Sequence, residues 1–130
     1  MRSLIPYLVF HGNCRGAMEF YKEVLDGEIT IMQTFGEAPF EVAEEFQNRI
    51  YNSEVRAGDI WIKASDDLPT HKVTAGNNFS LYLVFTDKKI REKVFNELSK
   101  EGKILFPLND NFAMLKDKFN IQWMLVLQDN

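Results

Sequence analysis

Cysteine is nearly absent from this chain of 130 residues, in which Cys14 stands alone. A single cysteine cannot form a disulfide within the chain, a composition that fits a reducing cytoplasm. The sequence also lacks an apolar run of the roughly 20 residues that a membrane-spanning helix needs, and its first residues lack the apolar core and cleavage site of a signal peptide. We therefore expect a soluble cytoplasmic protein.

Positive charge is scarce as well, with 15 lysines and arginines against 19 acidic residues and a net charge of −4. The two signs are interleaved along the chain, so we predict neither a nucleic-acid nor a membrane partner. What the chain does contain is an apolar fraction of 45%, with 11 phenylalanines. It is long and apolar enough to form one domain, residues 1–130, around a core that needs no disulfides.

The first part of the chain predicts a strand, a helix and a second strand. The apolar run 4–10 ends at a polar turn, where Asn13 is placed to cap the following helix. Apolar residues then recur at helical spacing, at Ala17, Phe20, Tyr21, Val24 and Leu25. Gly27 is the predicted helix stop, and residues 28–35 form the next predicted strand.

A hairpin is predicted over residues 49–65, after a loop at 36–48, with its turn at Ala57-Gly58. That turn pairs residues of one face across the two strands: Arg56 with Asp59, Glu54 with Trp61, and Asn52 with Lys63. The opposite face is more apolar and carries Ser53, Val55, Ile60 and Ile62. We expect the apolar face to pack against a helix and the polar face to be solvated or to line a polar cavity.

The second part repeats this plan. A strand at 78–86 is followed by Asp87, a predicted cap, and by a helix that ends at Gly102. The apolar residues of this helix predicted to face inward are Ile90, Val94, Phe95 and Leu98. Three more strands are predicted at 103–106, 111–116 and 121–127.

The repeat sets the predicted fold. Phe10 to Gly27 and Phe85 to Gly102 span the same distance, because 27 − 10 and 102 − 85 both equal 17. We predict an α+β fold of two βαβββ modules, residues 1–66 and 77–130 with a linker at 67–76, forming a curved, barrel-like sheet around a central cleft. A ferredoxin-like α+β sandwich has a similar order of elements and remains an alternative.

Four segments carry a resemblance to a known family: GNCRGAMEFYKEVLDGEI at 12–29, the strand at 76–85, KVFNELSKEGKI at 93–104 and FAMLKDKFNIQW at 112–123. Together they resemble the PhnB-like branch of the vicinal oxygen chelate superfamily, which includes glyoxalase, bleomycin-resistance and extradiol dioxygenase proteins. The resemblance implies the paired-module fold and frequently a homodimer. Some relatives carry a methyltransferase label, but no glycine-rich nucleotide loop follows a strand here.

The resemblance also implies where a metal would lie. Superfamily enzymes usually place His or Gln, and then Glu, on the first and last strand of each module. The corresponding positions here are Pro6, residues 62–64, Asn78 and Met124, which are poor donors for a divalent metal. Asn52 stands where many relatives have a histidine. We therefore predict no bound metal and no cofactor.

The remaining polar candidates favour ordinary structural roles. His11 and His71 lack the spacing of a metal site, and Cys14 lacks a positioned base, so we predict surface histidines and an inert thiol. We predict that Glu41, Glu44 and Glu45 form a solvated group and that Asp66 and Asp67 end a strand.

The best candidates for a ligand site alternate along four predicted strands: Asn52, Glu54, Trp61, Lys63, Ser80, Tyr82, Gln122 and Met124. They form either a polar sheet face with cross-strand ion pairs or a pocket with few polar anchors among aromatic and sulfur groups. We predict no catalytic residue.

The function expected from these residues is metal-free binding of a small organic ligand in the cavity between the modules. The alternative is an enzyme of the same superfamily, either a metal-dependent isomerase, lyase or dioxygenase or an acid-base enzyme that uses Glu54 and Lys63. A vestigial pocket in a dimeric interaction module is a third possibility.

Overall fold

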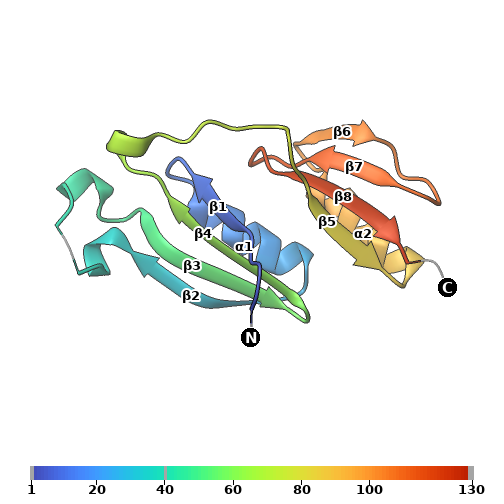
Figure 1. The fold of residues 1–130 in the computed structure, drawn as a ribbon, viewed down its shortest axis with the longest axis horizontal. Helices are drawn as coiled ribbons and strands as arrows, with labels where there is room; N and C mark the ends of the chain where they lie inside the picture. Colours follow the sequence, from blue (N-terminus) through green and yellow to red (C-terminus); the bar gives the residue numbers. More distant parts are fainter. Residues whose placement is uncertain (1, 40, 129–130) are drawn as a thin grey trace. The chain divides into compact units, whose positions relative to one another are not determined.

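The computed structural model describes residues 2–39 and 41–128, and the contacts within it divide the chain into two units, Met1–Thr74 and Ala75–Asn130. The described residues form an α-helix and a four-stranded sheet in each unit, which can be followed in Figure 1. Unit 1 contains β1 (Tyr7–Phe10), α1 (Cys14–Val24), β2 (Glu28–Thr34), β3 (Ile50–Ala57) and β4 (Ile60–Asp66), with 3-10 turns η1 (Phe35–Glu37), η2 (Glu44–Phe46) and η3 (Pro69–His71). Unit 2 contains β5 (Leu81–Phe85), α2 (Lys88–Leu98), β6 (Lys103–Phe106), β7 (Ala113–Lys116) and β8 (Gln122–Leu127).

Each unit is a βαβββ module. The strand orders are β1-β4-β3-β2 and β5-β8-β7-β6, and in both sheets the first pair is parallel and the others are antiparallel. The predicted α+β fold of two such modules is therefore confirmed, and the single-sheet ferredoxin-like alternative is excluded. The strands form two open four-stranded sheets instead of a closed barrel.

Helix α1 packs on its sheet through residues at helical spacing: Cys14, Ala17, Met18, Tyr21 and Val24 are all buried. Its amino end differs from the prediction, because Asn13 makes no side-chain cap. Asp66 takes that role from the end of β4, accepting hydrogen bonds from the amides of Gly12 and Cys14, both at 2.9 Å. Neither helix is long and apolar enough to span a membrane, and the described residues contain no other α-helix.

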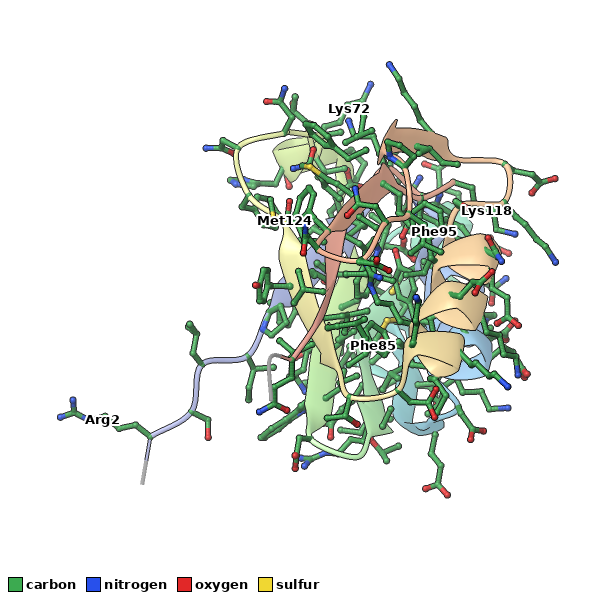
Figure 2. The ribbon with its side chains drawn as sticks, turned by 90° about the vertical axis from the view of Figure 1, so that its right-hand side faces the viewer. Arg2, Lys72, Phe85, Phe95, Lys118 and Met124 are labelled. Carbon is green, nitrogen blue, oxygen red and sulfur yellow. The ribbon has the colours of Figure 1, made fainter. Side chains whose placement is uncertain are left out.

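Helix α2 begins as predicted, since the Asp87 carboxylate accepts hydrogen bonds from the amides of Lys89 and Ile90 at 2.8 and 3.1 Å. Its inward face is Arg91, Val94, Phe95 and Leu98. The prediction that Ile90 faces inward was wrong, because Arg91 is buried instead and its Nε donates to the Leu125 carbonyl at 3.2 Å. Figure 2 shows Phe95 on the side of α2 that faces the sheet.

Helix α1 ends at Val24 and helix α2 at Leu98, before the predicted stops at Gly27 and Gly102, and in both cases the residue just before that glycine has a positive φ. Asp26 and Glu101 take up the left-handed conformation, with φ of 54° and 60°. The glycine that follows each of them meets a different requirement: a Cβ at Gly27 or Gly102 would collide with a backbone carbonyl oxygen of β3 or β7. These glycines are needed for close approach to the sheet and not for their φ angles.

The β3–β4 hairpin turns at Gly58-Asp59, one residue later than predicted. Gly58 has a φ of 57° at the first central position, as in a type II′ turn. Glu54 therefore pairs with Lys63, and Arg56 pairs with Trp61. The predicted pairs were wrong by two residues, but the predicted faces were correct because side chains alternate with a period of two.

Candidate functional site

The polar face of the first sheet points away from α1. The Ser53 hydroxyl lies 3.5 Å from the Cys14 sulfur on the helix side, so the neighbouring Asn52 and Glu54 project from the opposite side. We call this opposite side the first open face and define it by Asn52, Glu54, Arg56, Trp61 and Lys63, which come from β3 and β4.

Glu54 is the centre of this face. Its side chain is only 7% exposed, and its two oxygens lie 2.5 Å from Arg56 Nε and 3.4 Å from Lys63 Nζ. The Arg56 hydrogen bond outweighs the effect of burial and lowers the pKa of Glu54, with smaller contributions from Thr30 and the charge of Lys63. Glu54 is therefore a carboxylate at neutral pH, and both of its oxygens are occupied.

Arg56 is held from a second direction, because its guanidinium lies over the Trp61 ring at 3.7 Å from the ring centroid. Trp61 Nε1 is buried and has no hydrogen-bond partner within residues 2–39 and 41–128. A buried donor without an acceptor costs about 1–3 kcal/mol. The first open face thus combines a fixed guanidinium with an unsatisfied indole N–H.

The corresponding face of the second sheet carries the other four predicted residues. Gln122 Nε2 donates to Ser80 Oγ at 2.7 Å and to the Phe79 carbonyl at 3.1 Å. Tyr82 is 61% exposed and is the register partner of Met124 on β8. Figure 2 shows Met124 on the side of the sheet away from α2. We call this side the second open face.

The second open face is more apolar than the first. Its side chains include Tyr82, Val84, Met114, Met124 and Val126, with one polar contact at its edge between Ser80 and Gln122. The structure thus brings together four predicted residues on each sheet, each set within its own unit. That either set binds a ligand stays a prediction.

Sequence reasoning left Arg56 out of the candidate set, although the signal was available. Arg56 lies two residues from Glu54 on the same strand, so strict alternation places both on one face. Tyr7 was also left out. It is the register partner of Lys63, and its neighbour Leu8 is buried while Tyr7 is 51% exposed, so Tyr7 lies on the first open face.

Asp66 and Asp67 do more than end a strand. Both are buried, and Asp66 also accepts a hydrogen bond from the Ile50 amide at 2.8 Å. Asp67 lies 2.9 Å from His11 Nδ1 and 3.2 Å from Arg49 Nη1, and accepts from the Val73 amide at 2.7 Å. Burial alone would raise the pKa of Asp67, but these bonds and the two nearby basic groups lower it below its usual value.

His11 is 53% exposed at its side chain, as expected of a surface histidine, but its ring is fixed by this buried carboxylate. Cys14 is fully buried, and burial raises the pKa of its thiol to about 12, which leaves it protonated and unreactive at neutral pH.

The residues do not fit the metal site of the superfamily. In the described part of the chain, no group of three His, Cys, Asp or Glu side chains could hold a metal ion. Glu54, the carboxylate of the first open face, already uses both oxygens in ion pairs. The absence of a bound metal remains a prediction about the protein in solution.

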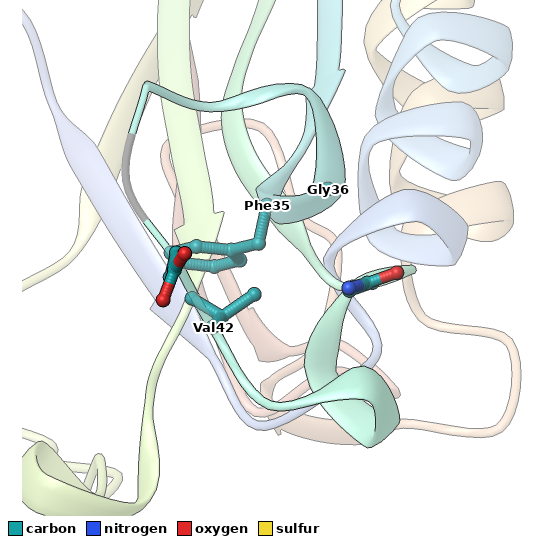
Figure 3. A pocket seen from close by; sticks show the side chains of 5 residues that line it. Phe35, Gly36 and Val42 are labelled. Carbon is teal, nitrogen blue, oxygen red and sulfur yellow. The ribbon is translucent and has the colours of Figure 1, made fainter.

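A separate pocket of about 320 Å³ lies at the end of β2, where the chain leaves the sheet (Figure 3). It is lined by Phe35, Gly36, Glu41, Val42 and Gln47. The loop is closed by hydrogen bonds from the Phe35 and Gly36 amides to the Arg49 and Gln47 carbonyls, each at 2.9 Å. Sequence reasoning treated residues 36–48 as a loop with room for one helical turn, which the structure contains at η2, and did not predict a pocket.

Comparison with known proteins identifies relatives along the whole chain. The family model for 3-demethylubiquinone-9 3-methyltransferase matches residues 2–126. Protein YjdN of Escherichia coli strain K12 is 28% identical over 137 residues, which cover 94% of this chain and 92% of YjdN. Protein PA1353 of Pseudomonas aeruginosa is 31% identical, with a TM-score of 0.91 over 99% of this chain and 100% of PA1353.

Two further structures extend the comparison. The PhnB protein of Bacillus cereus is 25% identical, with a TM-score of 0.81 over 98% of this chain and 100% of PhnB. The fosfomycin resistance protein FosX of Mesorhizobium loti has a TM-score of 0.66 over 96% of this chain and 90% of FosX, but only 12% identity, and so shows the fold alone. The chain belongs to the 3-demethylubiquinone-9 3-methyltransferase family and is similar over nearly its whole length to a PhnB protein, which confirms the PhnB-like resemblance seen in its sequence.

Proposed function

We propose that this PhnB-like protein binds a small organic ligand on its first open face without a metal ion. The observation that carries the proposal is the arrangement around Glu54, where Arg56 and Lys63 are held in place beside Trp61, whose buried N–H has no acceptor. Few polar anchors next to an aromatic ring are typical of a small-molecule site. The earlier expectation of a cavity between the modules goes further than this proposal, which needs only the first sheet.

An acid-base role for Glu54 and Lys63 is less well supported. A general base works best when its pKa lies near the working pH. The Arg56 hydrogen bond instead lowers the pKa of Glu54, and both carboxylate oxygens already accept from cations. Glu54 is therefore suited to positioning Arg56 and Lys63 and poorly suited to proton transfer.

A thermal-shift screen of small organic molecules, run with EDTA and again with added divalent metals, tests the proposal. A ligand that binds only the folded protein at 100 times its Kd should stabilise it by about 2.7 kcal/mol. We expect ligands whose stabilisation is the same with and without metal.

Lys63→Met should abolish the shift while retaining the packing of the side-chain stem. The matched control is Lys116→Met on the second sheet, which should leave the shift intact. Stabilisation that requires a metal, or turnover that Glu54→Gln abolishes, would instead support the enzyme alternative. A screen without any stabilising molecule would contradict ligand binding.

A homodimer is a further part of the proposal. Ile104 and Phe106 lie on β6, the edge strand of the second sheet, and are 51% and 54% exposed. An edge strand with exposed apolar residues is usually covered by another chain or element. Light scattering should therefore give the mass of two chains, and a monomer at working concentrations would contradict this part.

A further inference from the structure

We infer that the ligand of the first open face is an aromatic oxyanion, a planar apolar ring that bears a carboxylate or sulfonate group. This inference rests on the proposed function and names the class of ligand. It follows from three features of the face: its free hydrogen-bond donors, its local charge and the aromatic surface beside it.

The free donors are concentrated on Arg56. Its Nε donates a hydrogen bond to Glu54, and its guanidinium plane stacks on the Trp61 ring. The described residues offer no acceptor to its two terminal nitrogens. The Arg56 side chain is 47% exposed, so this edge is open to solvent. A guanidinium with a free edge can bind two oxygens of one carboxylate or sulfonate group at the same time. Because Glu54 and Trp61 already hold Arg56, binding loses little side-chain entropy.

The neighbouring donors add to this preference. Lys63 Nζ makes one long contact of 3.4 Å to Glu54 and is 25% exposed at its side chain, which leaves donors for a ligand. The buried Trp61 N–H lacks an acceptor, whereas the second tryptophan, Trp123, donates to the Asp117 carboxylate at 2.9 Å. The accessible donors of the first open face are therefore those of Arg56 and Lys63, and a ligand that brings oxygen atoms supplies their acceptors.

Charge on the face also favours an anion. Two cations, Arg56 and Lys63, surround one carboxylate whose oxygens are both occupied. A second acid on this face is Glu28, the register partner of Arg56 on β2, and the ion pairs of the described residues include none between these two side chains. Glu28 is thus a weak opposing charge, and its removal should strengthen anion binding.

The apolar part of the ligand has a matching surface on β1. Tyr7 lies directly beside Lys63, and Val9 follows it on the same face; they are 51% and 40% exposed. An aromatic ring anchored at Arg56 and Lys63 can lie against these side chains. Exposed apolar groups next to fixed cations suit a molecule that is apolar at one end and anionic at the other.

Two fluorescent probes test the inference, because they share one ring system and differ in a single group. The probe 8-anilino-1-naphthalenesulfonate carries a sulfonate, and N-phenyl-1-naphthylamine does not. We expect the sulfonate probe to bind at least about tenfold more tightly, as expected for charge-assisted bonds to a guanidinium. Arg56→Gln should remove most of this difference, Arg56→Lys should remove part of it, and Glu28→Gln should increase it.

Lys116→Met on the second sheet is the control and should leave both affinities unchanged. Native-like circular dichroism must accompany each variant, so that lost binding is not lost folding. Equal affinity for both probes, or a preference for the sulfonate that survives Arg56→Gln, would overturn the inference. If the thermal-shift screen still yields ligands in that case, the proposed function stands without the oxyanion. If the screen yields none, the proposed function fails as well.

Discussion

The two units of this protein share one order of elements and differ in how far apart in sequence their buried aspartates and the groups that they bind lie. In each unit, the residue that follows the last strand of the parallel pair donates its amide hydrogen to the final carbonyl of the first strand. The Asp67 amide after β4 donates to the Phe10 carbonyl of β1, and the Gln128 amide after β8 donates to the Phe85 carbonyl of β5, each at 2.7 Å. In unit 1, however, Asp66 and Asp67 bind groups more than 50 residues away. In unit 2, Asp117 accepts hydrogen bonds from groups 2 to 6 residues away.

This difference extends to the open faces. The first carries the Glu54 ion pairs and the second carries tyrosine, valine and methionine side chains. The side of each sheet that contacts its helix is apolar in both units, because it forms the core. The comparison teaches that the core side preserves the repeat, whereas the side away from the helix is free to differ and is where function is expected to reside.

In both units, the glycine that follows the helix lies close to a backbone carbonyl oxygen of the sheet. Gly27→Ala and Gly102→Ala test this shared feature, and we expect them to cause the largest loss of stability. A Cβ at either position would overlap a backbone carbonyl oxygen, of Arg56 or of Lys116. Because a backbone carbonyl cannot rotate away as a side chain can, each change should lower the free energy of unfolding by about 3 kcal/mol. Urea unfolding followed by tryptophan fluorescence measures both.

Gly76→Ala is the matched control, since the nearest atom to its Cβ would be a side-chain oxygen of Asn78 at 3.6 Å. It should change the free energy of unfolding by less than about 0.5 kcal/mol. If either Gly27 or Gly102 tolerated alanine as well as Gly76 does, the two helix ends would not be equivalent.

A loss of similar size is expected at one of the two helix caps, and a smaller loss at the other. Asp66→Ala leaves the amides of Gly12, Cys14 and Ile50 without their acceptor in a buried place, and should cost about 3 kcal/mol. Asp87→Ala removes an exposed local cap and should cost about 1 kcal/mol. Equal losses in urea unfolding would show that the long-range acid of unit 1 contributes no more than the local one of unit 2.

A smaller effect depends on pH. Burial opposes ionisation of Asp67, but the Val73 amide, His11 and Arg49 outweigh it and hold its pKa below the usual 3.8. A carboxylate with a lowered folded pKa stabilises the fold above the unfolded value, and this stabilisation is lost as the pH falls through the folded pKa. We therefore expect Asp67→Asn to reduce stability at neutral pH and to flatten its decline below about pH 4.

Unfolding curves measured from pH 7 to pH 2 test this expectation, with Asp87→Asn as the control in unit 2. A decline in Asp67→Asn as steep as in the unchanged protein would mean that Asp67 does not carry the acid sensitivity.

The separation in sequence between contacting residues also explains which features the sequence could predict. Most of each helix face, the Asp87 cap and the alternation that places Glu54 and Lys63 together depend on residues close in sequence, and these could be predicted. The Asp66 cap could not, because it connects a helix to the end of a strand 52 residues away. The buried Arg91 broke the hydrophobic pattern because a backbone carbonyl, invisible in the sequence, accepts its Nε–H.

The hairpin register lies between these cases. A period of two gave the correct faces, but the turn could have been placed at either of two adjacent dipeptides around Gly58. Its φ of 57° at the first central position decided the register, and that angle is a property of the folded chain. The hydrophobic pattern and the strand register place the eight candidate residues on their faces. Neither of them identifies a ligand, so the binding role of these residues could not be predicted from them.

The smallest expected effect concerns a surface ion pair of unit 2. Lys88 Nζ lies 3.0 Å from Asp110, but the two side chains are 69% and 82% exposed. Water and salt screen such pairs, and holding two long side chains together costs entropy. Asp110→Asn should therefore change the free energy of unfolding by less than about 0.5 kcal/mol. A double-mutant cycle with Lys88→Met, measured at low and high salt, isolates the pair. A coupling above about 1 kcal/mol would exceed the range of exposed pairs and would break the contrast between surface charge in unit 2 and buried charge in unit 1.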